Sequence, residues 1–223
     1  IEEKFKSDSE NALPRSIIEA IAERGNIYEV GGTVRDRFIG KDIEFKDRDY
    51  LVTGISYNEL SDLLREYGRV DLVGKSFGVI KFTPPKMGMT YDIALPRKEI
   101  STGEGHRDFE VDFDYRLTVE EDLLRRDFTI NAIALDLAEN KIIDPLNGRR
   151  DIQEGIIRMI SESSFLDDPL RMLRAIQFAA RFQFAIEPKT LLSIKCNALK
   201  INTISVERIQ EELNKMLTRA EKP

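Results

Sequence analysis

The order of apolar and polar positions divides the chain into a mixed part and a helical part. Apolar residues recur at helical spacing in 16–24 and 57–67. Short apolar or alternating runs predict strands at 27–30, 49–52, 77–82, 90–95, 128–137 and 141–143. From residue 151 onward the pattern is helical throughout. We therefore predict an α+β fold class with two domains, a mixed one at 1–152 and an all-α one at 153–223.

The composition excludes several kinds of chemistry but says less about the fold. A single cysteine, Cys196, excludes an internal disulfide and suits a reducing cytoplasm. A single histidine, His106, argues against zinc sites and histidine-based triads, so carboxylate oxygens would hold any metal, which favours Mg²⁺. No apolar run approaches the ~20 residues of a membrane-spanning helix, and we expect no membrane partner. The net charge of −6 argues against nucleic acid, but an enzyme needs basic groups only along one cleft.

Two glycines, Gly31 and Gly32, join a predicted strand to a predicted helix. Glycines at a helix start let backbone N–H groups approach a phosphate closely, and the helix dipole favours the negative charge. Arg35, in the first turn, can add a bidentate contact to phosphate oxygens. An ordinary tight turn with a surface Arg35–Asp36 pair explains the same residues, and for this motif taken alone it is the better explanation, because short motifs match by chance.

Asp47 and Asp49 flank Arg48 at the start of an apolar predicted strand. Side chains two apart on a strand share a face, so the two carboxylates can share a pair of Mg²⁺ ions while Arg48 faces away. A third carboxylate, Asp92, lies in another predicted strand, where an inward acid is costly unless it is paired or metal-bound. Rival pairs with the same spacing are Asp42/Glu44 and Asp112/Asp114. The strand after Asp49 favours the first pair over these rivals and over a solvated charged loop.

Two arginine-rich stretches leave a structural and a functional interpretation open. Arg125 and Arg126 can complement a helix dipole or present a guanidinium to a triphosphate. Asp168-Pro169 predicts a helix start. A polar stripe follows at every third residue, formed by Asp168, Arg171, Arg174 and Gln177. Such a stripe is typical of a surface helix with i,i+3 ion pairs, yet an arginine fork beside an accepting aspartate can also match the edge of a base.

Five motifs in register resemble the bacterial and eukaryotic, class II, tRNA nucleotidyltransferases (CCA-adding enzymes) and their poly(A) polymerase relatives. They are Gly-Gly-Thr-Val-Arg-Asp at 31–36, Asp-Arg-Asp at 47–49, Arg-Arg-Asp-Phe-Thr-Ile-Asn-Ala at 125–132, Asp-Pro-Leu-Asn-Gly at 144–148 and Asp-Asp-Pro-Leu-Arg-Met-Leu-Arg at 167–174. The resemblance implies a polymerase-β-like nucleotidyltransferase head, with a mixed sheet of about five strands and flanking helices, and then an all-α neck. Relatives continue into helical body and tail regions, so we expect part of a longer protein.

The resemblance also implies roles for single positions. Asp47, Asp49 and Asp92 correspond to the catalytic carboxylates, and the first two of them to Mg²⁺ ligands. Nucleotide-binding positions correspond to Gly31, Gly32, Arg35, Arg126, Asn131, Asp168, Arg171 and Arg174. Among these, the resemblance implies base reading by Asp168 and Arg171 and a triphosphate contact from Arg174.

Two positions depart from the pattern of these relatives. Asp167 stands where relatives usually have glutamate. Gln177 stands where they often have arginine, which implies a triphosphate contact that is missing or has moved to Arg181.

The implied activity is the addition of C, C and A to the 3′ end of tRNA from CTP and ATP, in the cytoplasm. In such two-metal transfer one ion lowers the pKa of the RNA 3′-hydroxyl and the other holds the leaving pyrophosphate. Poly(A) polymerase is the nearest alternative, although the stretch 74–79 resembles the CCA-adding side more closely. Enzymes that add only CC tend to lack the long loop retained at 100–116, which we expect to be a mobile loop or a poorly formed hairpin. A non-catalytic RNA- or nucleotide-binding module ranks lower, because the carboxylates are present.

Overall fold

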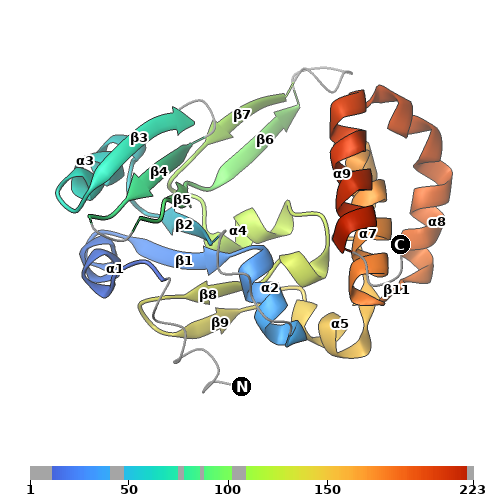
Figure 1. The fold of residues 1–223 in the computed structure, drawn as a ribbon, viewed down its shortest axis with the longest axis horizontal. Coiled ribbons are helices and arrows are strands. Elements are labelled where there is room, and N and C mark those ends of the chain that lie inside the picture. Colours follow the sequence, from blue (N-terminus) through green and yellow to red (C-terminus); the bar gives the residue numbers. More distant parts are fainter. Residues whose placement is uncertain (1–11, 41–47, 75–77, 86–87, 102–108, 220–223) are drawn as a thin grey trace.

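The computed structural model describes residues 12–40, 48–74, 78–85, 88–101 and 109–219. A mixed sheet forms one side of the molecule and C-terminal helices form the other (Figure 1). Asp47 and the rival acids Asp42 and Glu44 lie outside the described residues. None of the described helices is long and apolar enough to cross a membrane.

Seven of the described strands form one mixed sheet in the order β3-β4-β5-β2-β1-β8-β9. Their bounds are β1 Asn26–Val30, β2 Asp49–Thr53, β3 Arg69–Gly74, β4 Val79–Thr83, β5 Tyr91–Ala94, β8 Ala134–Asp136 and β9 Lys141–Ile143. Strand β1 pairs antiparallel with β2 and β8, and β2 pairs parallel with β5. Of the predicted carboxylates, Asp49 lies on β2 and Asp92 on β5. The mixed α+β class is confirmed, but the sheet is wider than the about five strands expected.

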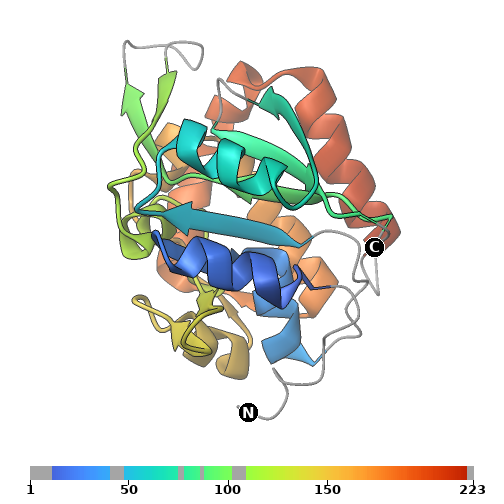
Figure 2. The ribbon, with the colours of Figure 1, turned by 90° about the vertical axis from the view of Figure 1, so that its left-hand side faces the viewer.

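The two faces of the sheet pack against different helices. Tyr50 belongs to the apolar core shared with α1 (Arg15–Ala22) and α3 (Tyr57–Arg65). These two helices lie across the front of the sheet in Figure 2. Leu51 instead packs with α4 (Val119–Leu124) on the opposite face. Because side chains alternate along a strand, consecutive residues of β1 and β2 face these two layers in turn.

Local capping signals fix where two helices near the site begin. The Thr118 hydroxyl accepts a hydrogen bond from the Glu121 N–H at 3.3 Å, and the Glu121 carboxylate accepts one from the Thr118 N–H at 2.8 Å. This capping box starts α4. At α7 (Leu170–Phe182), Asp168 Oδ1 accepts a hydrogen bond from the Leu170 N–H at 3.1 Å, so the predicted helix start is confirmed to within one residue.

The C-terminal part is helical apart from one short strand pair. Its helices are α5 Gly148–Glu154, α6 Ser164–Asp167, α7, α8 Pro188–Asn197, the 3₁₀ segment η4 Ala198–Thr203 and α9 Val206–Arg219. Strands β10 (Ile156–Ile157) and β11 (Ala185–Ile186) pair in parallel, so the expectation of helix throughout is wrong at these residues. One apolar core joins Val34 and Phe128 with Phe178, and therefore crosses the boundary expected near residue 152.

One other predicted element differs from the structure, and in a second, expected as a mobile loop or a poorly formed hairpin, the described residues form paired strands. The single strand expected at 128–137 is a 3₁₀ turn, η3 (Thr129–Asn131), followed by β8. The chain turns there because Ala132 N–H bonds to the Thr129 carbonyl at 3.0 Å. Within the expected loop at 100–116, the described backbone forms an antiparallel hairpin of β6 (Arg97–Ser101) and β7 (Phe109–Phe113).

Candidate active site

A cavity of about 590 Å³ lies between the sheet and helices α7 and α9. Every predicted site residue that the structure describes lines it, namely Gly31, Gly32, Arg35, Asp49, Asp92, Arg126, Asn131, Asp168, Arg171 and Arg174. Further basic side chains come from Arg97, Arg125, Arg181, Arg208, Lys215 and Arg219. A group of arginines and one lysine thus lines one cleft of a chain with net charge −6, and such a cleft attracts polyanions such as phosphates.

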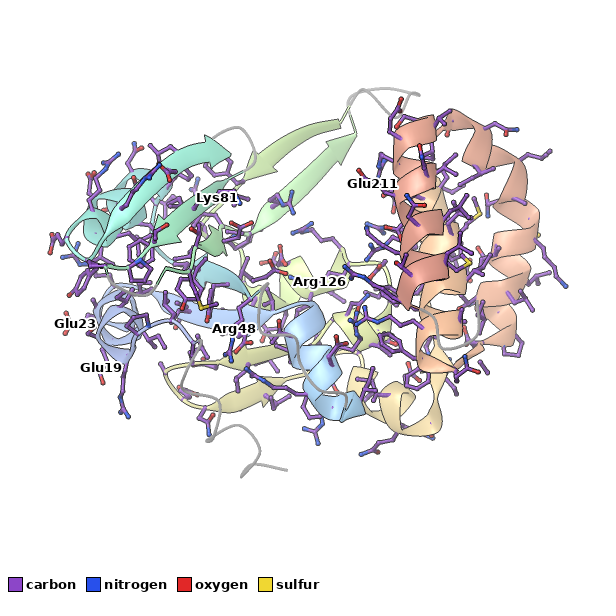
Figure 3. The ribbon with its side chains drawn as sticks, in the orientation of Figure 1. Glu19, Glu23, Arg48, Lys81, Arg126 and Glu211 are labelled. Carbon is purple, nitrogen blue, oxygen red and sulfur yellow. The ribbon has the colours of Figure 1, made fainter. Side chains whose placement is uncertain are left out.

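The glycine bend and the predicted metal ligand are in direct contact. Gly31 has φ +81°, which disfavours any residue with a Cβ. A Cβ at Gly31 would lie 3.0 Å from Asp49 Oδ2 and 3.8 Å from Arg126 Nη1. The carboxylate and the guanidinium therefore face the same stretch of open backbone, at the start of α2 (Gly32–Ile39). Figure 3 shows Arg126 in the space between the sheet and helices α7 and α9.

The described carboxylates lie side by side on adjacent strands. Asp49 and Asp92 are register partners in the parallel pairing of β2 with β5, and both line the cavity. Lys81 Nζ pairs with Asp92 Oδ1 at 2.8 Å across β4 and β5. In the part of the chain that the structure describes, no group of three metal-ligating side chains forms. The rival Asp114 lines a separate hollow with Tyr57, a distinction that the spacing of the acids alone could not make.

Arg35 is held inside the protein and does not lie on its surface. Its side chain is 5% exposed, and its Nη1 donates to Asn131 Oδ1 at 2.6 Å while its Nε donates to Asp36 Oδ1 at 2.7 Å. The guanidinium lies 5.0 Å from the centroid of the Phe178 ring and 4.8 Å from that of Phe182. Burial lowers the pKa of Arg35, and the charge of Asp36 opposes that shift. A surface Arg35–Asp36 pair is excluded as the explanation of this motif.

Asp127 connects the arginine-rich motif to helix α7. Its Oδ1 accepts hydrogen bonds from the Phe128 N–H and from Asn131 Nδ2, each at 2.8 Å. Its Oδ2 accepts from Arg174 Nε at 2.8 Å and Nη2 at 2.7 Å. Burial opposes ionisation of Asp127, but the Arg174 charge and the hydrogen bonds lower the pKa of its carboxyl below the usual value. Sequence reasoning gave this residue no role of its own.

Asp122 holds both arginines at the end of α4. Its side chain is 0% exposed. Oδ1 accepts from Arg125 Nε at 2.9 Å, and Oδ2 accepts from Arg126 Nη2 at 3.1 Å. The spacings i,i+3 and i,i+4 on one helix face are a sequence signal that could have identified this acid. Both arginines are thereby directed by a buried carboxylate at the edge of the cavity.

Comparison with known proteins identifies the family. The model of the poly(A) polymerase head domain matches residues 27–158, which is more than half of the chain. The chain belongs to this family. The match includes the Gly31 bend, Asp49, Asp92 and the arginine-rich motif with Asp122 and Asp127. A second model, described as the probable RNA- and SrmB-binding site of polymerase A, matches residues 183–221.

Two curated relatives are identical to this chain at about two fifths of the aligned positions. The chain is 42% identical over 193 residues to the multifunctional CCA protein of Nitrosococcus oceani, covering 86% of the chain and 44% of that protein. It is 43% identical over 197 residues to the CCA-adding enzyme of Buchnera aphidicola, covering 86% of the chain and 45% of the relative. The chain therefore spans slightly less than half the length of these relatives.

Solved structures of CCA-adding enzymes share the fold. The Bacillus stearothermophilus enzyme in complex with CTP has a TM-score of 0.75 at 32% identity, with 91% of this chain and 47% of that one covered. An apo form of a CCA-adding enzyme gives a TM-score of 0.80 at 32% identity, with 95% and 51% covered. The Thermotoga maritima enzyme complexed with tRNA gives 0.74 at 32% identity, with 93% and 47% covered.

In this family member the two residues predicted to read the base have separate partners. Asp168 Oδ2 accepts from Arg208 Nη2 of α9 at 2.9 Å. Arg171 donates to Ser164 Oγ at 3.0 Å and to the Arg125 carbonyl at 2.9 Å. Both side chains line the cavity, next to the arginines of the head domain. The contacts from α9 were missed by sequence reasoning, since that helix shows only amphipathic spacing.

The structure of α7 also shows what surrounds the departure at Gln177. Gln177 is 3% exposed and lines the cavity. Arg181, one turn further along α7, lines the cavity as well and pairs with Asp36 at 3.1 Å. A guanidinium is therefore present near the position where the resemblance implied a displaced arginine, and its role there stays a prediction.

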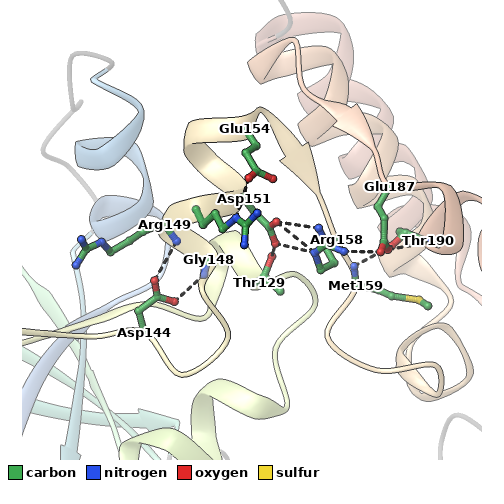
Figure 4. A network of polar contacts seen from close by, with 11 residues as sticks. Thr129, Asp144, Gly148, Arg149, Asp151, Glu154, Arg158, Met159, Glu187 and Thr190 are labelled. Carbon is green, nitrogen blue, oxygen red and sulfur yellow. Dashed lines mark hydrogen bonds and ion pairs between the residues drawn. The ribbon is translucent and has the colours of Figure 1, made fainter.

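A polar network fixes the turn that carries Asn131. The buried Asp151 of α5 accepts hydrogen bonds from Thr129 Oγ1 at 2.6 Å and from Arg158 Nε at 3.0 Å (Figure 4). Arg158 also pairs with Glu187, whose carboxylate accepts from Thr190 Oγ1 at 2.7 Å at the start of α8. The network joins η3, which is part of the arginine-rich motif, to helices α5 and α8, so it holds this motif against the C-terminal helices.

Proposed function

We propose that the chain is the catalytic part of an enzyme that adds nucleotides from CTP and ATP to the 3′ end of tRNA, completing its CCA terminus. The observation that carries the proposal is the position of the Asp49 carboxylate against the Gly31 bend and beside Arg126, within a cavity lined by arginines. Relatives named as CCA-adding enzymes, among them structures with CTP, ATP and tRNA, support it. We expect the reaction to take place in the cytoplasm, where both kinds of substrate are available.

We propose Mg²⁺ as the cofactor, with Asp49 and Asp47, two positions earlier in the sequence, as its ligands and Asp92 as the third catalytic carboxylate. The described residues fit such an ion, since Asp49 and Asp92 offer oxygen ligands from register-paired strands and line the same cavity. The chemistry that such an ion would supply is a lower pKa for an RNA 3′-hydroxyl and compensation of the charge on the leaving pyrophosphate. Lys81, which now pairs with Asp92, would keep that carboxylate oriented.

The remaining residues bind and orient the nucleotide. In the proposed reaction the 3′-hydroxyl oxygen forms a bond to the α-phosphorus, and the bond to pyrophosphate breaks. The N–H groups after the Gly31-Gly32 bend, together with Arg126 and Arg174, stabilise the triphosphate charge. Asp168, directly before Pro169 and α7, and Arg171, in the first turn of α7, contact the base edge. Arg35 supports this arrangement from within, through Asn131 at 2.6 Å.

We also propose that the chain divides into a catalytic head at 1–152 and a helical neck at 153–223. The cavity supports this division because strand ends of the first part and helices α7 and α9 of the second contribute to its lining. The match of 183–221 to a probable RNA-binding site supports a neck that faces RNA. The apolar core shared by Phe128 and Phe178 would keep the two parts aligned.

A product-length assay tests the proposed activity. The chain is incubated with labelled tRNA that lacks its last three nucleotides, with Mg²⁺ and with CTP, ATP or both, and the products are separated on a gel. The proposal predicts extension by C residues with CTP alone and completion of the three nucleotides with both. Long A tails without use of CTP would identify a poly(A) polymerase instead. No incorporation by the folded chain would contradict catalysis and favour a binding module.

A further inference from the structure

A buried carboxylate stands two residues before the glycine bend and does not line the cavity. Glu29, in β1, has a side chain that is 2% exposed. Its Oε1 accepts from Arg37 Nη2 of α2 at 3.0 Å, and its Oε2 accepts from Arg48 Nη1 at 3.5 Å. The side chains of Arg37 and Arg48 are 6% and 3% exposed. Three buried charges in one place are costly to desolvate, and this Glu29 ion cluster (Glu29, Arg37 and Arg48) needs a reason beyond stability.

Strand pairing places the Glu29 ion cluster on the opposite face from the predicted metal ligand. Glu29 is the register partner of Tyr50, and Val30 is the partner of Asp49. Since partners share a face and neighbours alternate, Glu29 and Tyr50 face the layer of helices α1 and α3, whereas Asp49 faces the opposite side, where it lines the cavity. Arg48, directly before Asp49, turns inward to Glu29. Figure 3 shows Arg48 beside β1, away from Arg126 in the cleft.

The same cluster holds both chain segments that meet at the bend. Arg48 fixes the start of β2, where Asp47 and Asp49 flank it in the sequence. Arg37 fixes α2, the helix that starts at Gly32 directly after the bend. One carboxylate in β1 therefore contacts both the residue directly before Asp49 and the helix that starts directly after the Gly31 bend. A ligand set of this kind functions only when its supporting groups hold it to within about 0.5 Å.

We propose that Glu29 is a positioning residue that preorganises Asp49 for a divalent cation by holding Arg48 and Arg37. The inference rests on the proposed function, because it assumes that Asp49 is a metal ligand. A purely structural role would predict loss of stability without a specific effect on the cation. Replacement of a buried ion cluster by apolar residues is often neutral for stability, so the two roles separate.

The experiment measures Mn²⁺ binding to the chain by electron paramagnetic resonance, without nucleotide or RNA. Two variants are compared with the wild type: Glu29→Gln, and the apolar variant Glu29→Met/Arg37→Leu/Arg48→Met, which keeps the fold if charge removal unfolds the first. Glu19→Gln is the matched control, since Glu19 forms an exposed pair with Arg15. We expect at least tenfold weaker Mn²⁺ binding by each folded variant and no change in the control.

Two outcomes distinguish this inference from the proposed function. Wild-type Mn²⁺ affinity in the folded apolar variant, with binding lost in Asp49→Ala, would overturn the positioning role of Glu29 alone. Equal affinity of Asp49→Ala and the wild type would overturn the metal site itself. Thermal melting followed by circular dichroism establishes that each variant is folded, so that an effect on stability is not mistaken for an effect on binding.

Discussion

Replacing Asp127 with asparagine should weaken the joint between the arginine-rich motif and α7. The wild-type carboxylate accepts from the Phe128 N–H and from Asn131 through Oδ1, and from Arg174 through Oδ2 at 2.7 and 2.8 Å. An asparagine keeps the shape and can keep the Oδ1 bonds. Its amide N–H₂ group, however, would face the donors of Arg174, and the negative charge is lost. Arg174 would then be a cation without its main partner.

The structure sets the size of the expected loss. Breaking a buried ion pair by removing one partner costs about 3–5 kcal/mol, and a hydrogen bond to a charged group contributes about 1.5–3 kcal/mol. The Arg174 side chain is 32% exposed and keeps Glu212 at 3.7 Å. Water and this second carboxylate offset part of the penalty. We therefore expect the free energy of unfolding to fall by about 2–3 kcal/mol.

Guanidinium chloride unfolding measures this change. With a slope of about 5 kcal/mol per molar, the midpoint should fall by about 0.5 M. The matched control is Asp62→Asn, because Asp62 pairs with Arg65 at 2.5 Å on the surface, with side chains 73% and 51% exposed. The control midpoint should move by less than about 0.1 M. If Asp127→Asn shifts the midpoint no more than the control does, the claim that Asp127 holds the joint is refuted.

Three further predictions concern the glycine bend, the hydrogen bond between Thr129 and Asp151, and the pKa of Asp127. Gly31→Ala strains a φ of +81° and presses a methyl group against Asp49 Oδ2 at 3.0 Å, so nucleotide incorporation should fall about 100-fold; an unchanged rate would contradict the tight approach. Thr129→Val removes one hydrogen-bond donor to the buried Asp151, so the free energy of unfolding should fall by about 1–3 kcal/mol, as measured by thermal unfolding. Thr129→Ser keeps the hydroxyl and should leave the free energy of unfolding unchanged. The pKa of Asp127 is lowered in the folded protein, so its carboxylate stabilises the fold at pH values above the unfolded pKa of about 3.9, and this stabilisation is lost as the pH falls through the folded pKa. On acidification the melting temperature of the wild type should therefore fall more than that of Asp127→Asn. An equal fall in both proteins would contradict this prediction.

Local signals in the sequence were sufficient for the bend and for the start of α7. Gly31 has a positive φ, a conformation that only glycine adopts readily. Asp168 accepts a hydrogen bond from the Leu170 N–H, as an N-terminal capping aspartate does. Such features depend on residues within a few positions of each other. They are readable because the conformational preference and the hydrogen-bond partner lie in the same short segment.

Elements decided by tertiary packing were not readable in this way. The segment after Arg126 is rich in β-branched and apolar residues, yet Phe128, Ile130 and Ile133 all enter the core shared with α7. In a strand Ile133 would face away from Phe128 and Ile130, whereas with the 3₁₀ turn at Thr129–Asn131 all three enter one core. Strand β3 was missed because an edge strand needs little apolar pattern, and Leu72 is 37% exposed.

Partners far away in the sequence decide the detailed site. Arg208 reaches Asp168 from a helix 40 residues later. Asp127 reaches Arg174 across 47 residues. No spacing rule links such positions, and the motifs predicted which residues would meet in the cavity but not which of them bond to each other. The interpretation of Asp168, Arg171 and Arg174 as a stripe of mutual ion pairs does not describe their contacts, since each has a different partner.

Turnover of Asp49→Asn tests the central claim most directly. Wild type and variant are mixed with labelled CTP, Mg²⁺ and tRNA that lacks its CCA end, and incorporation is followed by rapid quench. If Asp49 holds the divalent cation beside the Gly31 bend, the variant should lose turnover by about 1,000-fold or more while its melting temperature and CTP binding stay close to those of the wild type. Incorporation by the variant within about tenfold of the wild-type rate would contradict the account.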